Sequence, residues 1–358
     1  MEITDNIFFD IALIILASII VGVIATYFSI WLAKKLNIID YPGRLAHHIH
    51  KVPTPRAGGI AIVISFVILI ILFSLWQDEK LIQILLPSIV IFGFGVWDDR
   101  FGMNAPVKLL GQILAVTILI LLGIRVQFLE NQEFFIQFNQ LAAYWLDIGI
   151  TIFWMVGLIN AFNMVDSMDG LALGLARISS GFFMFMTIIS TQPSLVYLSA
   201  ILCGVGWGIY LFNLQPARTF LGDSGAQVLG FLLAALAIAY RPQSSSQQST
   251  WFVPVLLFIV PIFDTTLVTF SRIRKGKPFY KANRDHTYHR LMTFGWNSSH
   301  AVAVMHLTSI LSCLSAVIAL YSQPLQANLI FMVWMIFFFA LMYFFEKKFF
   351  HTISEQQS

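Results

Sequence analysis

Long apolar stretches alternate with short polar segments along almost the whole chain. About eleven of these stretches approach the roughly 20 mostly apolar residues that are needed to cross a bilayer. They lie near residues 10–33, 58–76, 81–97, 107–123, 146–163, 170–189, 195–213, 225–240, 251–271, 299–321 and 326–345. The pattern predicts an all-α polytopic membrane protein with about 10–11 transmembrane helices. Because the polar gaps are short, we expect a single integral-membrane domain over residues 1–358, with its core at 10–345.

The composition excludes a soluble protein of this length. Hydrophobic residues make up 58% of the chain, charged residues make up 11%, and the mean hydropathy is +0.80. A soluble fold could not bury so much apolar surface. The first apolar stretch lacks a basic start and a small-residue cleavage site, so we expect it to be retained. Cys203 and Cys313 lie inside predicted spans without metal-type spacing, which gives no indication of a disulfide or zinc site.

Basic residues are distributed unevenly between the two sides of the predicted bundle. If the loops alternate between the two sides, one side carries all but four of the 21 lysines and arginines. The exceptions are Lys80, Arg125 and Arg241 on the other side and Arg177 inside a predicted span. Because basic loops stay in the cytoplasm, we expect the N-terminus outside and the C-terminus in the cytoplasm.

Seven aspartates lie on this cytoplasmic side, in loops or at the ends of predicted spans, and several of them adjoin glycines. This set comprises Asp40, Asp98, Asp99, Asp166, Asp169, Asp223 and Asp285. Polar loops alone would explain scattered lysines and glutamates better than paired aspartates next to glycines. We therefore expect one active site on the cytoplasmic face, assembled from several helix ends.

In the segment "NAFNMVDSMDG", Asn160, Asn163, Asp166 and Asp169 follow one another at intervals of three. Three such steps rotate by about 180° on an α-helix, so one regular helix cannot turn all four side chains toward one ligand. We expect the span to end near Asn163 and to continue as a tight turn, with Gly170 permitting the break.

Asp98 and Asp99 are adjacent, and two carboxylates about 4 Å apart repel by about 4 kcal/mol at an effective dielectric of 20. Such a pair favours a bound cation or a retained proton. Lys108 and Gln112 lie four residues apart and share a helix face. Lys108 is suited to holding a phosphate, although the preference for lysine at cytoplasmic helix ends explains it equally well.

Asp223 stands between glycines in "FLGDSGAQ", just before a predicted helix. One interpretation is an ordinary helix cap. The other is a carboxylate on a tight turn, beside free backbone N–H groups, that binds a hydrated metal and phosphates.

The loop at 271–291 is the most basic part of the chain. Its Arg272, Arg274, His286 and His289 are suited to binding phosphate oxygens, although anionic lipid headgroups would attract the same charges. Nearby, Asp264 lies inside a predicted span and requires a partner, for which Arg177 is a candidate.

Five segments carry a resemblance to a known family. "PTPRAGG", "DDRFGMNAPVKLLGQ", "NAFNMVDSMDGLA", "FLGDSGA" and "RDHTYHRL" occur in the order seen in polyprenyl-phosphate N-acetylhexosamine-1-phosphate transferases (glycosyltransferase family 4). The chain most resembles the branch that forms undecaprenyl-diphosphate-GlcNAc. It lacks the three consecutive histidines of the muramoyl-pentapeptide branch.

The resemblance implies transfer of a sugar-1-phosphate from a UDP-N-acetylhexosamine to undecaprenyl phosphate, with UMP as the second product. The sugar that the resemblance favours is GlcNAc. This reaction is the first membrane step of cell-surface polysaccharide synthesis, for example of the O-antigen of lipopolysaccharide. It implies Mg²⁺ as cofactor, with Mn²⁺ as the alternative ion, and a multi-pass protein of the bacterial cytoplasmic (inner) membrane. The implied partners are the donor, the acceptor and membrane lipid, with a homodimer as one possible assembly and no nucleic acid.

The motifs of the family also imply roles for individual residues. Asp98 and Asp99 would be catalytic, and Asn163 and Asp223 would bind the metal. The predicted nucleotide- and substrate-binding residues are Asp166, Asp169, Lys108, Arg272, Arg274, His286, His289 and His50. Ser167 and Tyr288 depart from the usual motifs. Because Tyr288 lies in the motif implied to bind the sugar, GalNAc, QuiNAc and FucNAc stay alternative sugars.

Three other functions compete with this interpretation. A secondary transporter should have its ionisable residues near the membrane midplane at an internal repeat, and the sequence shows neither feature. A CDP-alcohol phosphotransferase requires an arginine soon after Asp169-Gly170, whereas Arg177 falls too late. A lipid-binding scaffold would not require the aspartates.

Overall fold

The computed structural model describes residues 7–42, 52–130, 138–241, 251–276 and 285–355. By their internal contacts, these residues form two compact units, Met1–Pro242 and Gln243–Ser358. The expectation of one domain over the whole chain stays a prediction.

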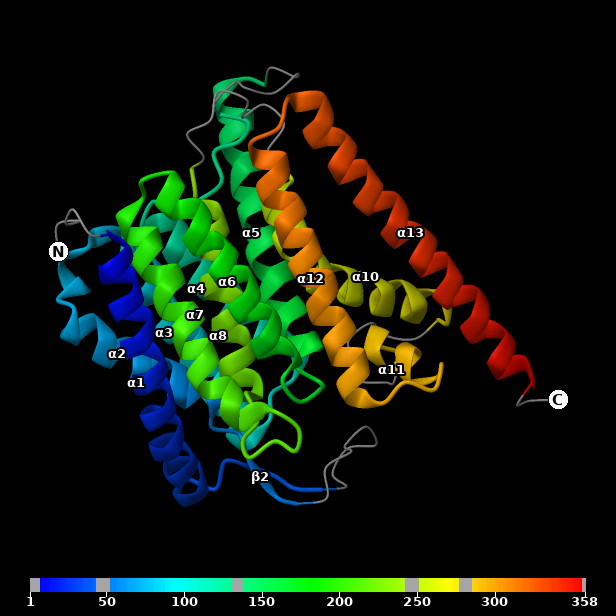
Figure 1. Cartoon of the computed structure of the whole chain (residues 1–358), viewed down its shortest axis with the longest axis horizontal. Helices are drawn as coiled ribbons and strands as arrows, with labels where there is room; N and C mark the ends of the chain where they lie inside the picture. The colour runs from blue at the N-terminus through cyan, green and yellow to red at the C-terminus, as the bar shows by residue number, and fades with distance from the viewer. Residues whose placement is uncertain (1–6, 43–51, 131–137, 242–250, 277–284, 356–358) are drawn as a thin grey trace. The chain divides into compact units, whose positions relative to one another are not determined.

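Unit 1 is a bundle of helices (Figure 1). Its helices are α1 (Ile7–Lys35), α2 (Gly58–Leu72), the 3₁₀ helix η1 (Leu75–Gln77), α3 (Glu79–Phe101), α4 (Ala105–Leu121), α5 (Gln140–Val165), α6 (Leu171–Ile189), α7 (Pro193–Asn213) and α8 (Gly222–Ala239). Two short strands, β1 (Ile39–Asp40) and β2 (Thr54–Pro55), pair in antiparallel orientation.

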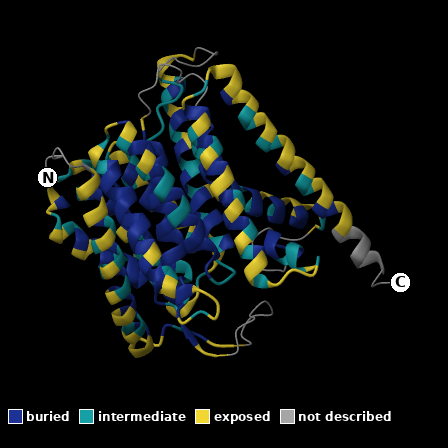
Figure 2. Cartoon of the chain, in the orientation of Figure 1, coloured by how far each residue is buried: buried dark blue, intermediate teal, exposed yellow. Residues whose placement is uncertain are grey.

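Helix α8 forms the centre of unit 1, and α2, α3, α5, α6 and α7 all pack against it. Its apolar residues are 94% buried, and much of the interior of unit 1 has the buried colour in Figure 2. Its residues Ala226, Gly230, Ala234 and Ala235 are small and apolar, which lets neighbouring backbones approach closely. Because Asp223 lies in the first turn of this central helix, its position is set by all the surrounding helices.

The segment "PTPRAGG" lies beside the start of α8 and is bound to it through the backbone. Phe220 N donates to Pro55 O at 2.9 Å, and Gly59 N donates to Leu221 O at 3.1 Å. A Cβ on Gly59 would lie 2.2 Å from Ser224 Oγ, so only glycine permits this approach. The glycine pair thus brings Arg56 alongside Asp223.

Unit 2 contains α9 (Val253–Leu257), α10 (Ile259–Arg274), α11 (Thr287–Met292), α12 (Ser298–Leu320) and α13 (Pro324–Glu355). The predicted continuous span at 251–271 is wrong, since the chain forms two helices that meet at Phe258. Pro254 and Pro261 each lie in the first turn of a helix. Proline suits that position because its missing N–H has no partner there, but inside a continuous helix it would remove a hydrogen bond.

The described residues confirm an all-α polytopic membrane protein. Eight of their helices are long and apolar enough to cross a membrane, and α2 and α4 are shorter apolar helices. Large apolar side chains such as Phe153 and Leu121 are about four-fifths exposed, as expected for surfaces that face lipid. The expected orientation and the cytoplasmic location of the site stay predictions.

Candidate active site

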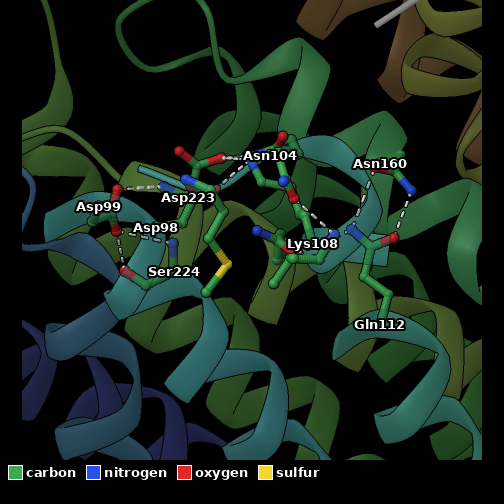
Figure 3. A network of polar contacts seen from close by, with 12 residues as sticks. Asp98, Asp99, Asn104, Lys108, Gln112, Asn160, Asp223 and Ser224 are labelled. Carbon is green, nitrogen blue, oxygen red and sulfur yellow. Dashed lines mark hydrogen bonds and ion pairs between the residues drawn. The ribbon is translucent and has the colours of Figure 1, made fainter. Parts of the chain in front are cut away.

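Two polar side chains from two helices meet at one oxygen atom of Asp223. Asp223 Oδ1 accepts hydrogen bonds from Lys108 Nζ of α4 at 2.8 Å and from Asn163 Nδ2 of α5 at 2.7 Å. Lys108 Nζ also forms an ion pair with Asp98 of α3 (Figure 3). The structure therefore brings together Asp98, Lys108, Asn163 and Asp223, as the sequence led us to expect.

Asp98 lies in the last turn of α3, where the helix ends before Gly102. Its Oδ1 accepts from Met103 N at 2.8 Å, which fixes the carboxylate relative to the following turn. The other oxygen faces Lys108, whose own helix is capped by Asn104 through Val107 N. A capped helix start thus positions a lysine between two carboxylates from α3 and α8.

Asp99 has a different environment from its neighbour Asp98. Its carboxylate caps the start of α8, accepting from Asp223 N at 2.9 Å, Ser224 N at 3.0 Å and Ser224 Oγ at 2.6 Å. A negative charge is also favoured there by the helix dipole. The contacts suit a residue that positions Asp223.

Arg56 brings positive charge from the first polar loop to this site, as its place in "PTPRAGG" led us to expect. Its guanidinium lies 3.2 Å from Asp40, 3.5 Å from Asp99 and 4.0 Å from Asp223. Burial alone would lower its pKa, but these three carboxylates raise it. Arg56 therefore carries a permanent charge between the first polar loop and α8.

A layer of amides lies one helical turn from the charged residues. Gln112 Nε2 donates to Gln227 Oε1 at 3.1 Å, and Asn160 Nδ2 donates to Gln112 Oε1 at 2.8 Å. Gln112 follows Lys108 by four positions, Gln227 follows Asp223 by four, and Asn160 precedes Asn163 by three. On each helix, the amide and the site residue therefore lie on the same face. Polar residues at that spacing within apolar spans were the sequence signal for this layer.

The turn after α5 carries Asp166 and Asp169. The helix runs two residues beyond Asn163, to Val165, and Gly170 then adopts a left-handed conformation with φ +75°. Gly170 N donates to Asn213 Oδ1 at 3.0 Å, and Asp169 Oδ2 accepts from Ala217 N at 3.2 Å. The expected break at Gly170 is confirmed, although the helix ends slightly later than expected.

Several carboxylates lie close enough to Asp166 to influence its pKa. Burial raises the pKa of its carboxyl group well above the ordinary range, and the neighbouring Asp223, Asp99 and Asp169 raise it further. Among the described residues, Asp98, Asp99 and Asp223 form ion pairs with only two cationic side chains, Arg56 and Lys108. A site with this excess of carboxylates favours an added cation.

The donor set at this site fits Mg²⁺. No three His, Cys, Asp or Glu side chains of the described residues form a preformed metal cluster. Mg²⁺ commonly uses only one or two protein carboxylates, with waters and substrate phosphates completing its shell. Asp223 and the amide oxygen of Asn163 would supply oxygen ligands of the required kind.

In unit 2, the predicted binding residues form ion pairs with acidic side chains. Arg272 lies 4.0 Å from Asp285, which also binds Lys275 Nζ at 2.8 Å. Arg274 lies 3.5 Å from Glu346, a residue of α13. These pairs partly neutralise a loop that looks strongly cationic in the sequence.

The two histidines of unit 2 differ in their surroundings. His286 is buried, and its Nδ1 lies 2.8 Å from Asp264 Oδ2. Asp264 Oδ1 also accepts from Thr287 N at 2.6 Å, so His286 and Thr287 take the place that the sequence suggested for Arg177. His289 packs against Tyr288, with ring centroids 4.2 Å apart. His50 lies outside the described residues.

Comparisons with known proteins show a family similarity over the segment that contains this site. Residues 81–241, which include Asp98, Lys108, Asn163 and Asp223, match the model of glycosyl transferase family 4. A Bacillus subtilis protein named "Probable undecaprenyl-phosphate N-acetylglucosaminyl 1-phosphate transferase" is 29% identical over 80% of this chain and 78% of its own length.

Two further relatives show how widely the similarity extends. Decaprenyl-phosphate N-acetylglucosaminephosphotransferase of Mycobacterium leprae is 29% identical over 83% of this chain and 81% of its own. Phospho-N-acetylmuramoyl-pentapeptide-transferase of Halalkalibacterium halodurans is 27% identical over 75% of this chain and 84% of its own. Over residues 81–241, the segment that contains the candidate site, the chain is therefore similar to glycosyl transferase family 4.

Proposed function

We propose that the protein transfers GlcNAc-1-phosphate from UDP-GlcNAc to undecaprenyl phosphate and releases UMP. The observation that carries this proposal is the meeting of Asp98, Lys108 and Asn163 around Asp223 at the ends of membrane helices. Such a site can hold a lipid-bound phosphate at the membrane surface and a charged donor beside it. The names of the bacterial relatives support a polyprenyl-phosphate acceptor and a GlcNAc donor.

In the proposed reaction, a phosphate oxygen of undecaprenyl phosphate attacks the phosphorus attached to the sugar. A new phosphoanhydride bond forms, and the anhydride bond to the UMP phosphate breaks, so UMP leaves with the electron pair. Asp98 orients the attacking phosphate or accepts its proton, and Lys108 binds phosphate oxygens through its ammonium group. Phosphoryl transfer depends mainly on such positioning and charge neutralisation.

Asn163 and Asp223 are the proposed Mg²⁺ ligands, and a bound Mg²⁺ would supply positive charge to the diphosphate of the donor. Asp99 holds Asp223 in place by capping α8. Asp166 and Asp169 are proposed to line the nucleotide side. Arg272, Arg274, His286, His289 and His50 are proposed to bind the diphosphate or the sugar.

We further propose a multi-pass location in the bacterial cytoplasmic membrane, with the site facing the cytoplasm, where nucleotide sugars are available. Other UDP-N-acetylhexosamines are the alternative donors. The reaction would then begin the synthesis of a different surface polysaccharide by the same chemistry.

The experiment is a UMP-release assay with purified protein, undecaprenyl phosphate, Mg²⁺ and a panel of UDP-sugars. The panel contains UDP-GlcNAc, UDP-GalNAc and UDP-MurNAc-pentapeptide. Fastest UMP release with UDP-GlcNAc supports the proposal, and fastest release with another donor corrects the sugar. An absence of UMP with every donor would overturn the transferase assignment.

A further inference from the structure

Arg177 is a charged residue of α6 that the proposed reaction does not use. It lies six residues after Leu171, the first residue of the helix, or about 9 Å along the axis. The centre of its guanidinium lies 3.7 Å from the ring centroid of Trp207 and 3.9 Å from that of Tyr210, both on α7. Two aromatic rings therefore hold this cation on the surface of α7.

The depth of this cluster matches the surface zone of a bilayer. Helix α6 begins where α7 ends, since Gly170 N donates to Asn213 Oδ1 at 3.0 Å. Trp207 lies six residues and Tyr210 three residues before Asn213, so both rings are within about two turns of that end. Tryptophan and tyrosine concentrate at this depth, near the lipid headgroups.

Arg177 has no carboxylate partner among the described residues. It interacts electrostatically with Tyr210 and Cys203, and it also forms a side-chain hydrogen bond with Tyr210. Its Nε is buried and donates to no acceptor of the described chain. A charged side chain inside a membrane span normally pairs with an opposite charge or marks a functional site. The described residues therefore give this guanidinium no full negative charge, which leaves it available to an anion from outside them.

The surface beside Arg177 is apolar and open. Trp207 is 44% exposed, Leu211 is 55% exposed and Leu214 is 43% exposed. Trp207 and Leu211 lie four positions apart on α7, and Leu214 directly follows the last residue of the helix, Asn213, so these apolar side chains make a stripe at this end of α7. A ligand for this place combines an anionic group for Arg177 with hydrocarbon chains for the stripe.

We propose that Arg177, Trp207 and Tyr210 form a binding site for the phosphate of a membrane lipid. The guanidinium donates to phosphate oxygens, for which its forked geometry is suited, while the lipid chains lie along Trp207, Leu211 and Leu214. A phospholipid and the polyprenyl phosphate both offer this chemistry. A purely structural stack of Arg177 on the two rings would require no lipid.

The test is native mass spectrometry of the purified protein titrated separately with phosphatidylglycerol, phosphatidylcholine and undecaprenyl phosphate. We expect Arg177→Met to bind the preferred phosphate lipid about tenfold or more weakly, which is the size of a lost charge-assisted hydrogen bond. Arg177→Lys keeps the charge and should retain part of the binding. Arg100→Met is the matched control, because Arg100 also lies over an aromatic ring, 5.3 Å from Phe101, but is exposed at the end of α3.

A loss specific to phosphatidylglycerol assigns the site to a phospholipid, and a loss specific to undecaprenyl phosphate assigns it to the acceptor lipid. Equal binding by the wild type and Arg177→Met for all three lipids would overturn the proposal. An equal loss in Arg100→Met would also overturn it, since the effect would then be one of general surface charge. If Arg177→Met does not fold, Trp207→Leu tests the same site at an exposed position and should weaken the same lipid.

Discussion

Asp99 and Asp98 are adjacent in the sequence, but their contacts predict different consequences of mutation. Asp99 accepts three hydrogen bonds from Asp223 and Ser224 at the start of α8. Asp99→Asn replaces one acceptor oxygen by an NH₂ group that faces an N–H or O–H donor. We therefore expect Asp99→Asn to reduce stability as well as activity.

The size of the effect follows from these contacts. A hydrogen bond to a charged group contributes about 1.5–3 kcal/mol. Losing one such bond and the charge at the helix start should cost about 2–3 kcal/mol. For a unit of this size, 1 kcal/mol shifts the unfolding midpoint by about 2–4 °C. We expect the midpoint of Asp99→Asn to fall by about 4–12 °C.

Asp98→Asn is the matched comparison. Its Oδ1 can still accept from Met103 N, and Lys108 remains paired with Asp223. We expect a stability loss of only about 1 kcal/mol with loss of UMP release. The assay is thermal unfolding of both variants in detergent, followed by UMP release at a temperature where both are folded. A wild-type midpoint for Asp99→Asn together with absent UMP release would refute the capping argument and place Asp99 on the substrate.

Three further predictions concern packing, amides and pH. Gln112→Leu should remove the donor to Gln227 Oε1 and one of the two acceptors of Asn160 Nδ2, which still donates to Val156 O. At about 1–3 kcal/mol for each lost bond, thermal unfolding of this variant should show a lower midpoint, and an unchanged midpoint would contradict the amide layer. Gly59→Ala should prevent folding or abolish UMP release because the new Cβ would overlap Ser224, whereas a Cβ on Gly93 has no atom within 4 Å, so Gly93→Ala should behave as the wild type. Equal behaviour of the two variants would contradict the close approach. Because the pKa of Asp166 is raised in the folded state, stability without metal should fall as the pH rises from the unfolded pKa of about 4 through the folded pKa. Asp166→Asn should flatten this pH dependence, and an identical pH profile of the two proteins would contradict this reasoning.

Much of the fold was predictable because a membrane helix is encoded by a local run of apolar residues. Helices α6 and α7 match their predicted stretches closely, α5 begins six residues before its predicted stretch, and the turn at Gly170 followed from glycine chemistry. The break at Phe258 was missed because a hydropathy pattern does not separate one span from two short helices. The prolines at 254 and 261 were the local sign of the break.

The site residues that lie in short motifs were predictable from the sequence, whereas contacts between segments far apart in the sequence were not. The aspartates and Lys108 were identified from short motifs. The pairing of Arg56 with Asp99 and Asp223 depends on how the first polar loop packs on α8, and the pairing of Arg274 with Glu346 depends on a helix far along the chain. No local pattern determines such contacts.

The most direct test of the proposed active site is UMP release by Asp223→Asn compared with Asp78→Asn. Asp78 caps α3 by accepting from Leu81 N at 3.0 Å, and asparagine is an equally good cap. Both variants remove one aspartate charge at a helix start, but only Asp223 contacts Lys108 and Asn163. The account predicts that Asp223→Asn purifies as a folded protein with no measurable Mg²⁺-dependent UMP release from UDP-GlcNAc and undecaprenyl phosphate, while Asp78→Asn retains wild-type release. Near-normal release by Asp223→Asn would contradict it.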